Sequence, residues 1–323
     1  MKRDRLVTAT LMPQPTRQRN WRRAIERLEG AYAPNTLRSY RVDFEIFEAW
    51  CISAGKRPLP ASPRTVAAFI AHQQDSVGAT TLRRRQAAIR KIHRLLRLPN
   101  PADDEDVVIA IRRAKRAKGS RPQQALGLTE AMRDRLIAAA PDTLAGLRNV
   151  ALLSVGYDTL CRRAELCALR LEDTAAMADG SRSILIRRAK NDPFADGRLG
   201  LMSPQSVAHM ERWIKAAGIE GGWIFRRVSS DGRVGDAPLD PASINRILKA
   251  MAHEASIDPA QIKRLSGHSM RVGAAQDMMA AGLGILPIMQ AGGWKSLSVV
   301  SRYVEHAELT TLAYLRERRG WVV

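Results

Sequence analysis

The apolar positions in the first third of the chain recur at steps of three and four residues, which is typical of amphipathic helices. Clusters of proline, glycine and polar residues separate these periodic stretches. The pattern predicts helices over residues 20–28, 34–54, 63–74, 79–97 and 104–118. The preceding stretch is rich in Arg, Gln and Thr and contains Pro13 and Pro15, so we expect residues 1–19 to form a disordered basic arm.

The helix predicted over residues 34–54 has the clearest apolar stripe. It begins at Pro34, a residue that suits the first helical position because its missing N–H has no partner there in any case. The stripe consists of Leu37, Tyr40, Phe44, Phe47 and Cys51. Arg38 and Arg41 fall outside the stripe and are expected to face solvent.

The helix predicted over residues 79–97 combines an apolar face with an arginine-rich face. The inner positions are Leu82, Ile89, Ile92, Leu95 and Leu96. The expected outer positions are Arg83, Arg84, Arg85, Arg90 and Arg94. Basic helices with an apolar inner stripe suit the phosphates and the major groove of DNA, and a solvated basic surface is the alternative.

The rest of the chain shows a weaker and more mixed pattern. Helices are expected over residues 130–140, 162–169, 241–255 and much of 268–318, with a buried apolar segment over 149–160. Strands are expected over 183–187 and 198–202, joined by a turn at 191–197, and a short apolar element over 221–225. The fold class is therefore mainly α with a small β-sheet (α+β). We divide the chain into residues 1–19, an all-helical domain 20–118, a linker 119–127 and a second domain 128–323.

Charge narrows the choice of partner. The chain of 323 residues carries 52 Lys and Arg against 32 Asp and Glu, a net charge of +20. Residues 1–118 hold 25 of these cations and 11 of the anions, a net charge of +14. This excess favours a polyanion such as DNA or RNA. A basic protein that binds membrane surfaces is the alternative, but no amphipathic anchor or lipidation motif supports it.

Cysteine usage and hydropathy exclude several other classes. Cys51, Cys161 and Cys167 have no CxxC spacing and lie in apolar helical patterns, so they favour core packing over a disulfide framework or a zinc site. No apolar run approaches 18 residues, and no signal peptide is recognisable. We expect no membrane contact, no metal, no cofactor, and a cytoplasmic, nucleoid-associated location in a prokaryote.

Candidate chemistry centres on the stretch Gly267-His268-Ser269-Met270-Arg271. Ser266 or Gly267 is a reasonable N-cap, so a helix is expected to begin near His268. His268 and Arg271 then share one face of its first turn. Free backbone N–H groups and the positive dipole end are found there too, so the pair makes an anion pocket suited to a phosphate.

Further ionisable residues fit phosphoryl transfer without a metal. Such a reaction needs positive donors for the equatorial oxygens of the transition state, a nucleophile, and an acid for the leaving oxygen. Arg162 lies three residues before Glu165, which can hold its guanidinium group, and Lys190 lies on the expected hairpin. A tyrosine hydroxyl can serve as the nucleophile, although ionising a free phenol at pH 7 costs roughly 4 kcal/mol.

Three strings then carry a family resemblance. They are Thr159-Leu-x-Arg-x-Ala-Glu165, Ser266-Gly-His-Ser-x-Arg-Val-Gly-Ala-Ala275 and Ile288-Met-Gln-Ala-Gly-Gly-Trp294, followed by Tyr303. In these strings and their order the chain resembles the tyrosine recombinase (phage integrase) family over roughly residues 30–318. The resemblance implies a two-domain, C-shaped DNA clamp and the catalytic set Arg162, Glu165, Lys190, His268, Arg271, Trp294 and Tyr303.

The resemblance also implies a role for each of these residues. Tyr303 would be the nucleophile and Lys190 the general acid for the leaving 5′ oxygen. Glu165 would orient Arg162 rather than react. Trp294 stands where most of the family has histidine, and its indole N–H can still donate to a phosphate oxygen.

The implied reaction is site-specific recombination of double-stranded DNA. The tyrosine would form a 3′-phosphotyrosyl link, and a 5′-hydroxyl from a partner duplex would attack it, through a Holliday junction and without ATP. Family members act as tetramers on two sites with inverted repeats, each burying a C-terminal helix in its neighbour. Here Leu309, Leu312, Ala313 and Leu315 are expected in that helix, or else in the core of their own subunit.

Expected DNA contacts lie on several helices. They are Arg38, Ser39, Arg41, Arg83, Arg84, Arg90, Ser243, Asn245 and Arg246. Ala242 and Asn245 depart from the Arg and Glu of the most similar family pattern, so we expect a different target sequence.

Alternative hypotheses remain at this point. A type IB topoisomerase uses the same chemistry to relax supercoils without a specific site, and a DNA-binding module with a decayed site would bind without cutting. Among the other tyrosines, Tyr40 and Tyr157 fall on apolar stripes and Tyr32 precedes a helix start. Tyr314 is therefore the rival nucleophile.

Overall fold

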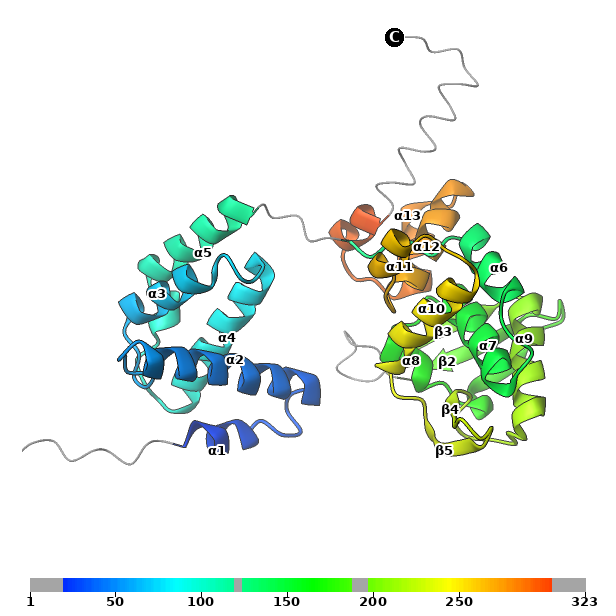
Figure 1. Ribbon diagram of the computed structural model, residues 1–323, viewed down its shortest axis with the longest axis horizontal. Coiled ribbons are helices and arrows are strands. Elements are labelled where there is room, and N and C mark those ends of the chain that lie inside the picture. The colour runs from blue at the N-terminus through cyan, green and yellow to red at the C-terminus, as the bar shows by residue number, and fades with distance from the viewer. Residues whose placement is uncertain (1–19, 119–123, 188–196, 304–323) are drawn as a thin grey trace, which may run out of the picture. The chain divides into compact units, whose positions relative to one another are not determined.

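The computed structural model describes residues 20–118, 124–187 and 197–303, and the chain forms two compact units, residues 1–123 and 124–323 (Figure 1). The expected basic arm, the lysine at position 190 and the expected C-terminal helix lie outside the described residues. Mainly helical structure with small antiparallel sheets confirms the predicted fold class. None of the described helices is long and apolar enough to cross a membrane.

The first unit is entirely helical in its described part. Its elements are α1 (Trp21–Glu26), α2 (Pro34–Ser53), α3 (Pro63–Gln73), α4 (Ala79–Leu95), the short 3-10 helix η1 (Pro101–Asp103) and α5 (Glu105–Lys118). The periodicity predicted each of the α-helices to within a few residues. Proline occupies the first turn of α2 and α3, and the Ser62 hydroxyl caps α3 by accepting from the Thr65 N–H.

Aromatic side chains join the helices of this unit. Phe47 lies edge-on to Phe44 and to Phe69, with ring centroids 5.6 and 5.1 Å apart, and Trp21 packs on Phe44 at 4.9 Å. All four are buried. Burial of each such ring contributes about 1.5–3 kcal/mol, so these contacts fix α1 and α3 on α2.

The prediction that Arg85 lies on the outer face of α4 is wrong. Its side chain is buried, donates to the Gln73 side chain and lies 3.9 Å from the carboxylate of Asp43. Asp43 is itself fully buried and also accepts two hydrogen bonds from Arg84, at 2.6 and 2.9 Å. A buried carboxylate requires such partners, which explains why an arginine turns inward here.

His93 is a second buried polar group of the first unit. Its Nε2 accepts the Ala61 N–H at 3.0 Å, and its Nδ1 lies 2.9 Å from the Ile89 carbonyl. This pairing requires a neutral ring with the proton on Nδ1. Burial lowers the pKa of His93.

The second unit combines helices with two small sheets. The helices are α6 (Glu130–Ala138), α7 (Leu144–Asp158), α8 (Arg163–Cys167), η2 (Leu171–Asp173), α9 (Pro204–Ala217), α10 (Ser243–Glu254), α11 (Pro259–Arg264), α12 (Ser269–Ala280) and α13 (Ile285–Gly292). The strands are β1 (Thr174–Ala176), β2 (Arg182–Ile186), β3 (Arg198–Met202), β4 (Arg226–Val228) and β5 (Val234–Pro238). The antiparallel order is β1-β2-β3, with β4-β5 as a separate hairpin.

Several elements of this unit were not predicted from the sequence. No helix was expected at α9, although Val207, Met210 and Trp213 recur at steps of three and are buried. Helix α11, strand β1 and the β4-β5 hairpin were not expected either. Residues 124–127, which were expected to be part of the linker, belong to the second unit, where the Leu126 N–H donates to the Arg264 carbonyl.

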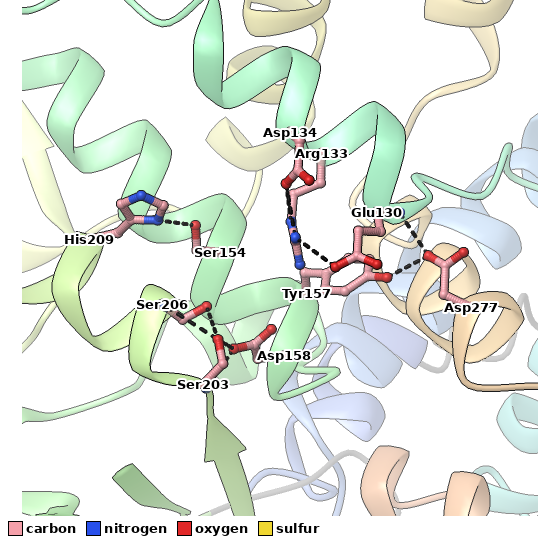
Figure 2. Close-up of polar contacts among 10 residues, drawn as sticks. All are labelled: Glu130, Arg133, Asp134, Ser154, Tyr157, Asp158, Ser203, Ser206, His209 and Asp277. Carbon is pink, nitrogen blue, oxygen red and sulfur yellow. Dashed lines mark hydrogen bonds and ion pairs between the residues drawn. The ribbon is translucent and has the colours of Figure 1, made fainter. Parts of the chain in front are cut away.

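A polar network ties α6, α7 and α12 together (Figure 2). The Tyr157 hydroxyl donates to Asp277, and the same carboxylate accepts the Glu130 N–H at 2.7 Å at the start of α6. The Arg133 guanidinium lies 4.7 Å from the Tyr157 ring centroid. Tyr157 is thus buried in a structural network, as its apolar stripe predicted.

A second pair of contacts in Figure 2 joins α7 to α9. Asp158 accepts both the backbone N–H and the hydroxyl of Ser203, at 2.8 and 2.6 Å, just before α9 begins. Ser154 and the His209 ring are 2.8 Å apart one turn along. These contacts fix the C-terminal end of α7, from which the candidate site continues.

The buried His93 should make the first unit sensitive to acid. The folded chain binds a proton on His93 more weakly than the unfolded chain, whose histidine pKa is about 6.5, so stability falls as the pH drops through that value. Between pH 7 and 5 we expect a loss of up to about 2 kcal/mol in the opening free energy of α3 and α4. Hydrogen-exchange mass spectrometry of the full chain, corrected for intrinsic rates, measures it.

His93→Gln should remove this pH dependence. His72→Gln is the matched control, because His72 is exposed, and it should keep the pH dependence of the wild type. The same acid sensitivity in wild type and His93→Gln would show that another group is responsible.

Candidate active site

The candidate site begins at the N-terminus of α12. His268 is the N-cap residue, and its N–H donates to the Ser266 hydroxyl at 3.2 Å. The Ser269 hydroxyl in turn accepts the Ser266 N–H at 2.9 Å. The predicted helix start is therefore confirmed to within one residue, with His268 exposed and Arg271 buried one turn further on.

Arg271 is the most deeply buried charge of the site. Its guanidinium group donates to the carbonyls of Leu160 and Gly292, the latter at 2.8 Å, and lies 4.4 Å from the Trp294 ring centroid. Burial and the nearby Arg162 lower the pKa of Arg271 to about 10, partly offset by Glu165. It still carries its charge at neutral pH.

The turn between α7 and α8 supplies the second arginine. Glu165 accepts the backbone N–H of Arg162 at 3.0 Å and its guanidinium at 2.7 Å, so one carboxylate holds both the backbone and the side chain of the N-cap residue of α8. Burial raises the pKa of Glu165, but these hydrogen bonds outweigh burial and hold it below its usual value. Leu160 precedes this turn with a φ of 49°, a conformation that is uncommon for a leucine and that directs its carbonyl to Arg271.

The turn after α13 positions the aromatic members. Gly293 has a φ of 61° and ends α13 in the left-handed conformation that glycine favours. A Cβ on Gly292 would lie 2.0 Å from the Trp294 ring, so only glycine leaves room for the indole. Trp294 is buried, and its ring centroid is 5.7 Å from that of the half-buried Tyr303.

The fold therefore brings together five of the residues selected from the sequence: Arg162, Glu165, Arg271, Trp294 and Tyr303. His268 lies on the same first turn of α12 as Arg271. Within residues 20–118, 124–187 and 197–303, no group of three or more His, Cys, Asp and Glu side chains is placed to hold a metal ion. All three cysteines are buried, in agreement with the core packing predicted for them.

One residue of the site was missed. Arg198, the first residue of β3, donates to the carbonyls of Thr159 and Ala291 and lies 3.7 Å from Glu165. An arginine in a strand of alternating polar and apolar residues is expected at the surface, so the sequence did not predict that its side chain points inward.

The candidate DNA contacts on α10 are already engaged with the protein. The Asn245 amide oxygen accepts the Gly267 N–H at 2.7 Å, so α10 is tied to the loop that precedes His268. Arg246 donates to the Ser243 hydroxyl at 3.3 Å. The structure thus gives Asn245 a structural contact that its position in the sequence did not predict.

The candidate contacts of the first unit fall into two groups. Arg38, Arg41 and Arg83 are exposed, and no ion pair holds them among the described residues. Arg84 is held by Asp43 and Arg90 by Asp103. The Ser39 hydroxyl donates to the Asn35 carbonyl at 2.9 Å within α2.

Comparison with known proteins agrees with this architecture. The phage integrase family model matches residues 127–309, and the model of the phage integrase N-terminal SAM-like domain matches residues 26–98. The chain belongs to the phage integrase family, which confirms the resemblance found in the sequence.

Individual relatives extend over most of the chain. The recombinase cre of Escherichia phage P1 is 30% identical over 284 residues, 83% of this chain and 83% of its own. An integrase/recombinase xerD homolog of Selenomonas ruminantium is 30% identical over 300 residues, 89% of this chain and 86% of its own. The crystal structure of the XerH site-specific recombinase bound to palindromic difH substrate has a TM-score of 0.64 at 13% identity, over 88% of this chain and 79% of that one. The last likeness concerns the fold.

Arg271→Ala should destabilise the second unit, because it leaves the Leu160 and Gly292 carbonyls without their charged donor. Hydrogen bonds to charged groups contribute roughly 1.5–3 kcal/mol each, so we expect the opening free energy of α12 to fall by about 3 kcal/mol. Hydrogen exchange of α12 amides in the full chain measures this change.

Arg233→Ala is the matched control, because Arg233 is 87% exposed and pairs only at the surface with Asp231. It should leave α12 exchange unchanged. Equal effects of the two substitutions would contradict the bridging role of Arg271.

Proposed function

We propose that this chain is a site-specific DNA recombinase that breaks and rejoins double-stranded DNA through a 3′-phosphotyrosyl link on Tyr303. The observation that supports this most strongly is the position of Arg271. Its guanidinium donates to the carbonyls of Leu160 and Gly292 and lies over the Trp294 ring, whose centroid is 5.7 Å from that of Tyr303. Membership of the phage integrase family supports the same conclusion.

The guanidinium groups supply the electrostatic part of the reaction. Arg162 and Arg271 hold the non-bridging oxygens of the phosphate and stabilise the charge that develops on them, together with His268 and the indole N–H of Trp294. Glu165 keeps the Arg162 fork oriented. Such donors are pre-organised in a partly buried site and cost little reorganisation during the reaction.

The covalent steps exchange one phosphodiester for another. The Tyr303 phenol gives up its proton to solvent as its oxygen attacks phosphorus, the bond to the 5′ oxygen breaks, and Lys190 donates a proton to that leaving oxygen. A 5′-hydroxyl of a partner strand then attacks the phosphorus of the link and returns its proton to Lys190, and the Tyr303 oxygen leaves and regains a proton. Bond energy is retained in the link, so the reaction uses neither ATP nor another cofactor.

The assembly part of the proposal follows the relatives. We infer a Cre-like homotetramer acting on two inverted-repeat sites through a Holliday junction, with residues 309–315 reaching a neighbouring subunit. The basic arm 1–19, the helical domain 20–118 and a linker that begins at residue 119 would complete a C-shaped clamp on DNA with the catalytic domain. A protein acting on chromosomal, plasmid or phage DNA would work in the cytoplasm, at the nucleoid.

Covalent trapping tests the nucleophile. Nicked duplexes covering the DNA that flanks this gene are incubated with the full chain without magnesium, and products are separated on a denaturing gel. We expect an adduct with wild type and with Tyr40→Phe, a matched control on α2, but none with Tyr303→Phe. An adduct with Tyr303→Phe that disappears in Tyr314→Phe would transfer the role to Tyr314.

The same DNA distinguishes recombination from topoisomerase activity. A recombinase exchanges strands only between duplexes that carry the trapped site, whereas relaxation of a supercoiled plasmid without that site would favour the topoisomerase hypothesis. Specific binding without any adduct would indicate a DNA-binding module.

Salt dependence tests which arginines meet phosphate. Each phosphate contact adds about 0.9 to the magnitude of the slope of log K against log salt. Arg83→Ala should lower the magnitude of the slope by about 0.9. Arg84→Ala, the same change at the adjacent residue, should lower it less, because Asp43 already neutralises Arg84. Binding titrations by fluorescence anisotropy at several salt concentrations measure both, and equal slopes for the two variants would contradict this assignment.

A further inference from the structure

Arg198 lies between two segments of the candidate site, the turn at residues 159–162 and the turn at residues 291–294. Its side chain is only 12% exposed, whereas that of Leu199, the next residue of the same strand, is 69% exposed. A Cβ on Gly293 would lie 2.9 Å from Arg198 Cδ, so the glycine lets the arginine pass beneath the turn after α13. This depth is unusual for an arginine and requires a specific set of partners.

The partners of Arg198 run parallel to those of Arg271. Arg198 Nη2 donates to the Thr159 carbonyl at 2.9 Å, and Nη1 donates to the Ala291 carbonyl at 2.8 Å. Arg271 donates to the next carbonyl along on each side, those of Leu160 and Gly292. Two guanidinium groups thus join the same two backbone segments at consecutive residues.

These two segments carry the donors proposed for the phosphate. Residues 159–162 end in Arg162, and residues 291–294 end in Trp294. Arg198 also lies 3.7 Å from Glu165 Oε2, while Glu165 Oε1 holds Arg162 at 2.7 Å. A change at Arg198 therefore reaches Arg162 through the shared carboxylate of Glu165, and it reaches Arg162 and Trp294 through three residues of backbone on each side.

A lysine could not replace this arrangement. Its ammonium is a single point at the end of a flexible stem, whereas the planar guanidinium group presents its two terminal nitrogens to carbonyls on opposite sides. Arg198→Lys keeps the positive charge and loses the hydrogen bonds to the two carbonyls. The variant therefore distinguishes an effect of the lost bridge from an effect of lost charge.

We propose that Arg198 is a positioning residue, which holds the turn at residues 291–294 and Glu165 against the turn at 159–162 and so sets the spacing of Arg162 and Trp294 around a DNA phosphate. This role rests on the proposed recombinase function. The role of Arg198 on β3 is distinct from that of the hairpin lysine. Lys190 is the proposed acid for the leaving oxygen, whereas the contacts of Arg198 lead to the donors for the non-bridging oxygens.

Two readouts on the full chain test the role of Arg198. In Arg198→Lys, hydrogen exchange of the amides at residues 291–296 should rise at least tenfold while that of α9 is unchanged. The single-turnover rate of adduct formation, measured on saturated protein–DNA complex, should fall about 10- to 100-fold with the DNA dissociation constant within about threefold of wild type. Arg182→Lys, the same change on the neighbouring strand β2 where Arg182 pairs with Glu211, should leave both readouts within twofold.

A substrate with a 5′-bridging sulfur separates positioning of the phosphate donors from positioning of the general acid. Sulfur leaves without a proton, so a defect acting through the leaving-group acid disappears with this substrate. The Arg198→Lys defect should persist, and its disappearance would overturn the proposal. So would wild-type exchange at residues 291–296.

The outcomes also distinguish this role from the proposed function. If wild type forms no Tyr303 adduct, the recombinase function fails, while the exchange readout still decides whether Arg198 holds the turn. If Arg198→Lys does not fold, Arg198→Gln, which is neutral and can donate to one of the two carbonyls, is measured in the same way. Wild-type values of both readouts in that variant would overturn the proposal.

Discussion

The buried guanidinium group of Arg271 is the interaction on which the second unit depends. It joins the carbonyl of Leu160, two residues after α7, to that of Gly292, at the end of α13. Burying a charge costs several kcal/mol unless hydrogen bonds and an opposite charge offset the loss of water. Here two carbonyls, Glu165 and the face of the Trp294 ring provide that compensation, so the segments carrying them must meet at Arg271.

The same site carries more positive charge than its own carboxylate offsets. Arg162, Arg198 and Arg271 all interact with Glu165, and their mutual repulsion contributes to the lowered pKa of Arg271. A phosphate would relieve this repulsion, and the free protein holds the groups in place through backbone carbonyls instead. Rigid placement of donors before the substrate arrives is what electrostatic catalysis requires.

The first unit uses one residue type for two purposes. Arg85 is buried and Arg84 is fixed on the buried carboxylate of Asp43, so both support the helix packing. Arg38 and Arg83 remain exposed and are available to a polyanion. Net charge reports only the sum of these roles, because burial and pairing decide which cations a DNA phosphate can reach.

The sequence by itself determined the α-helices of the first unit, the mainly α class and most residues of the candidate site, because helix periodicity and short motifs are local properties. Only the tertiary structure decided that Arg85 turns inward, that Asn245 binds the Gly267 backbone, and that Arg198 enters the site. Each of these depends on a partner that is distant in sequence, Asp43, Gly267 or Ala291. No local pattern records such a partner, since the chain brings it close only when it folds.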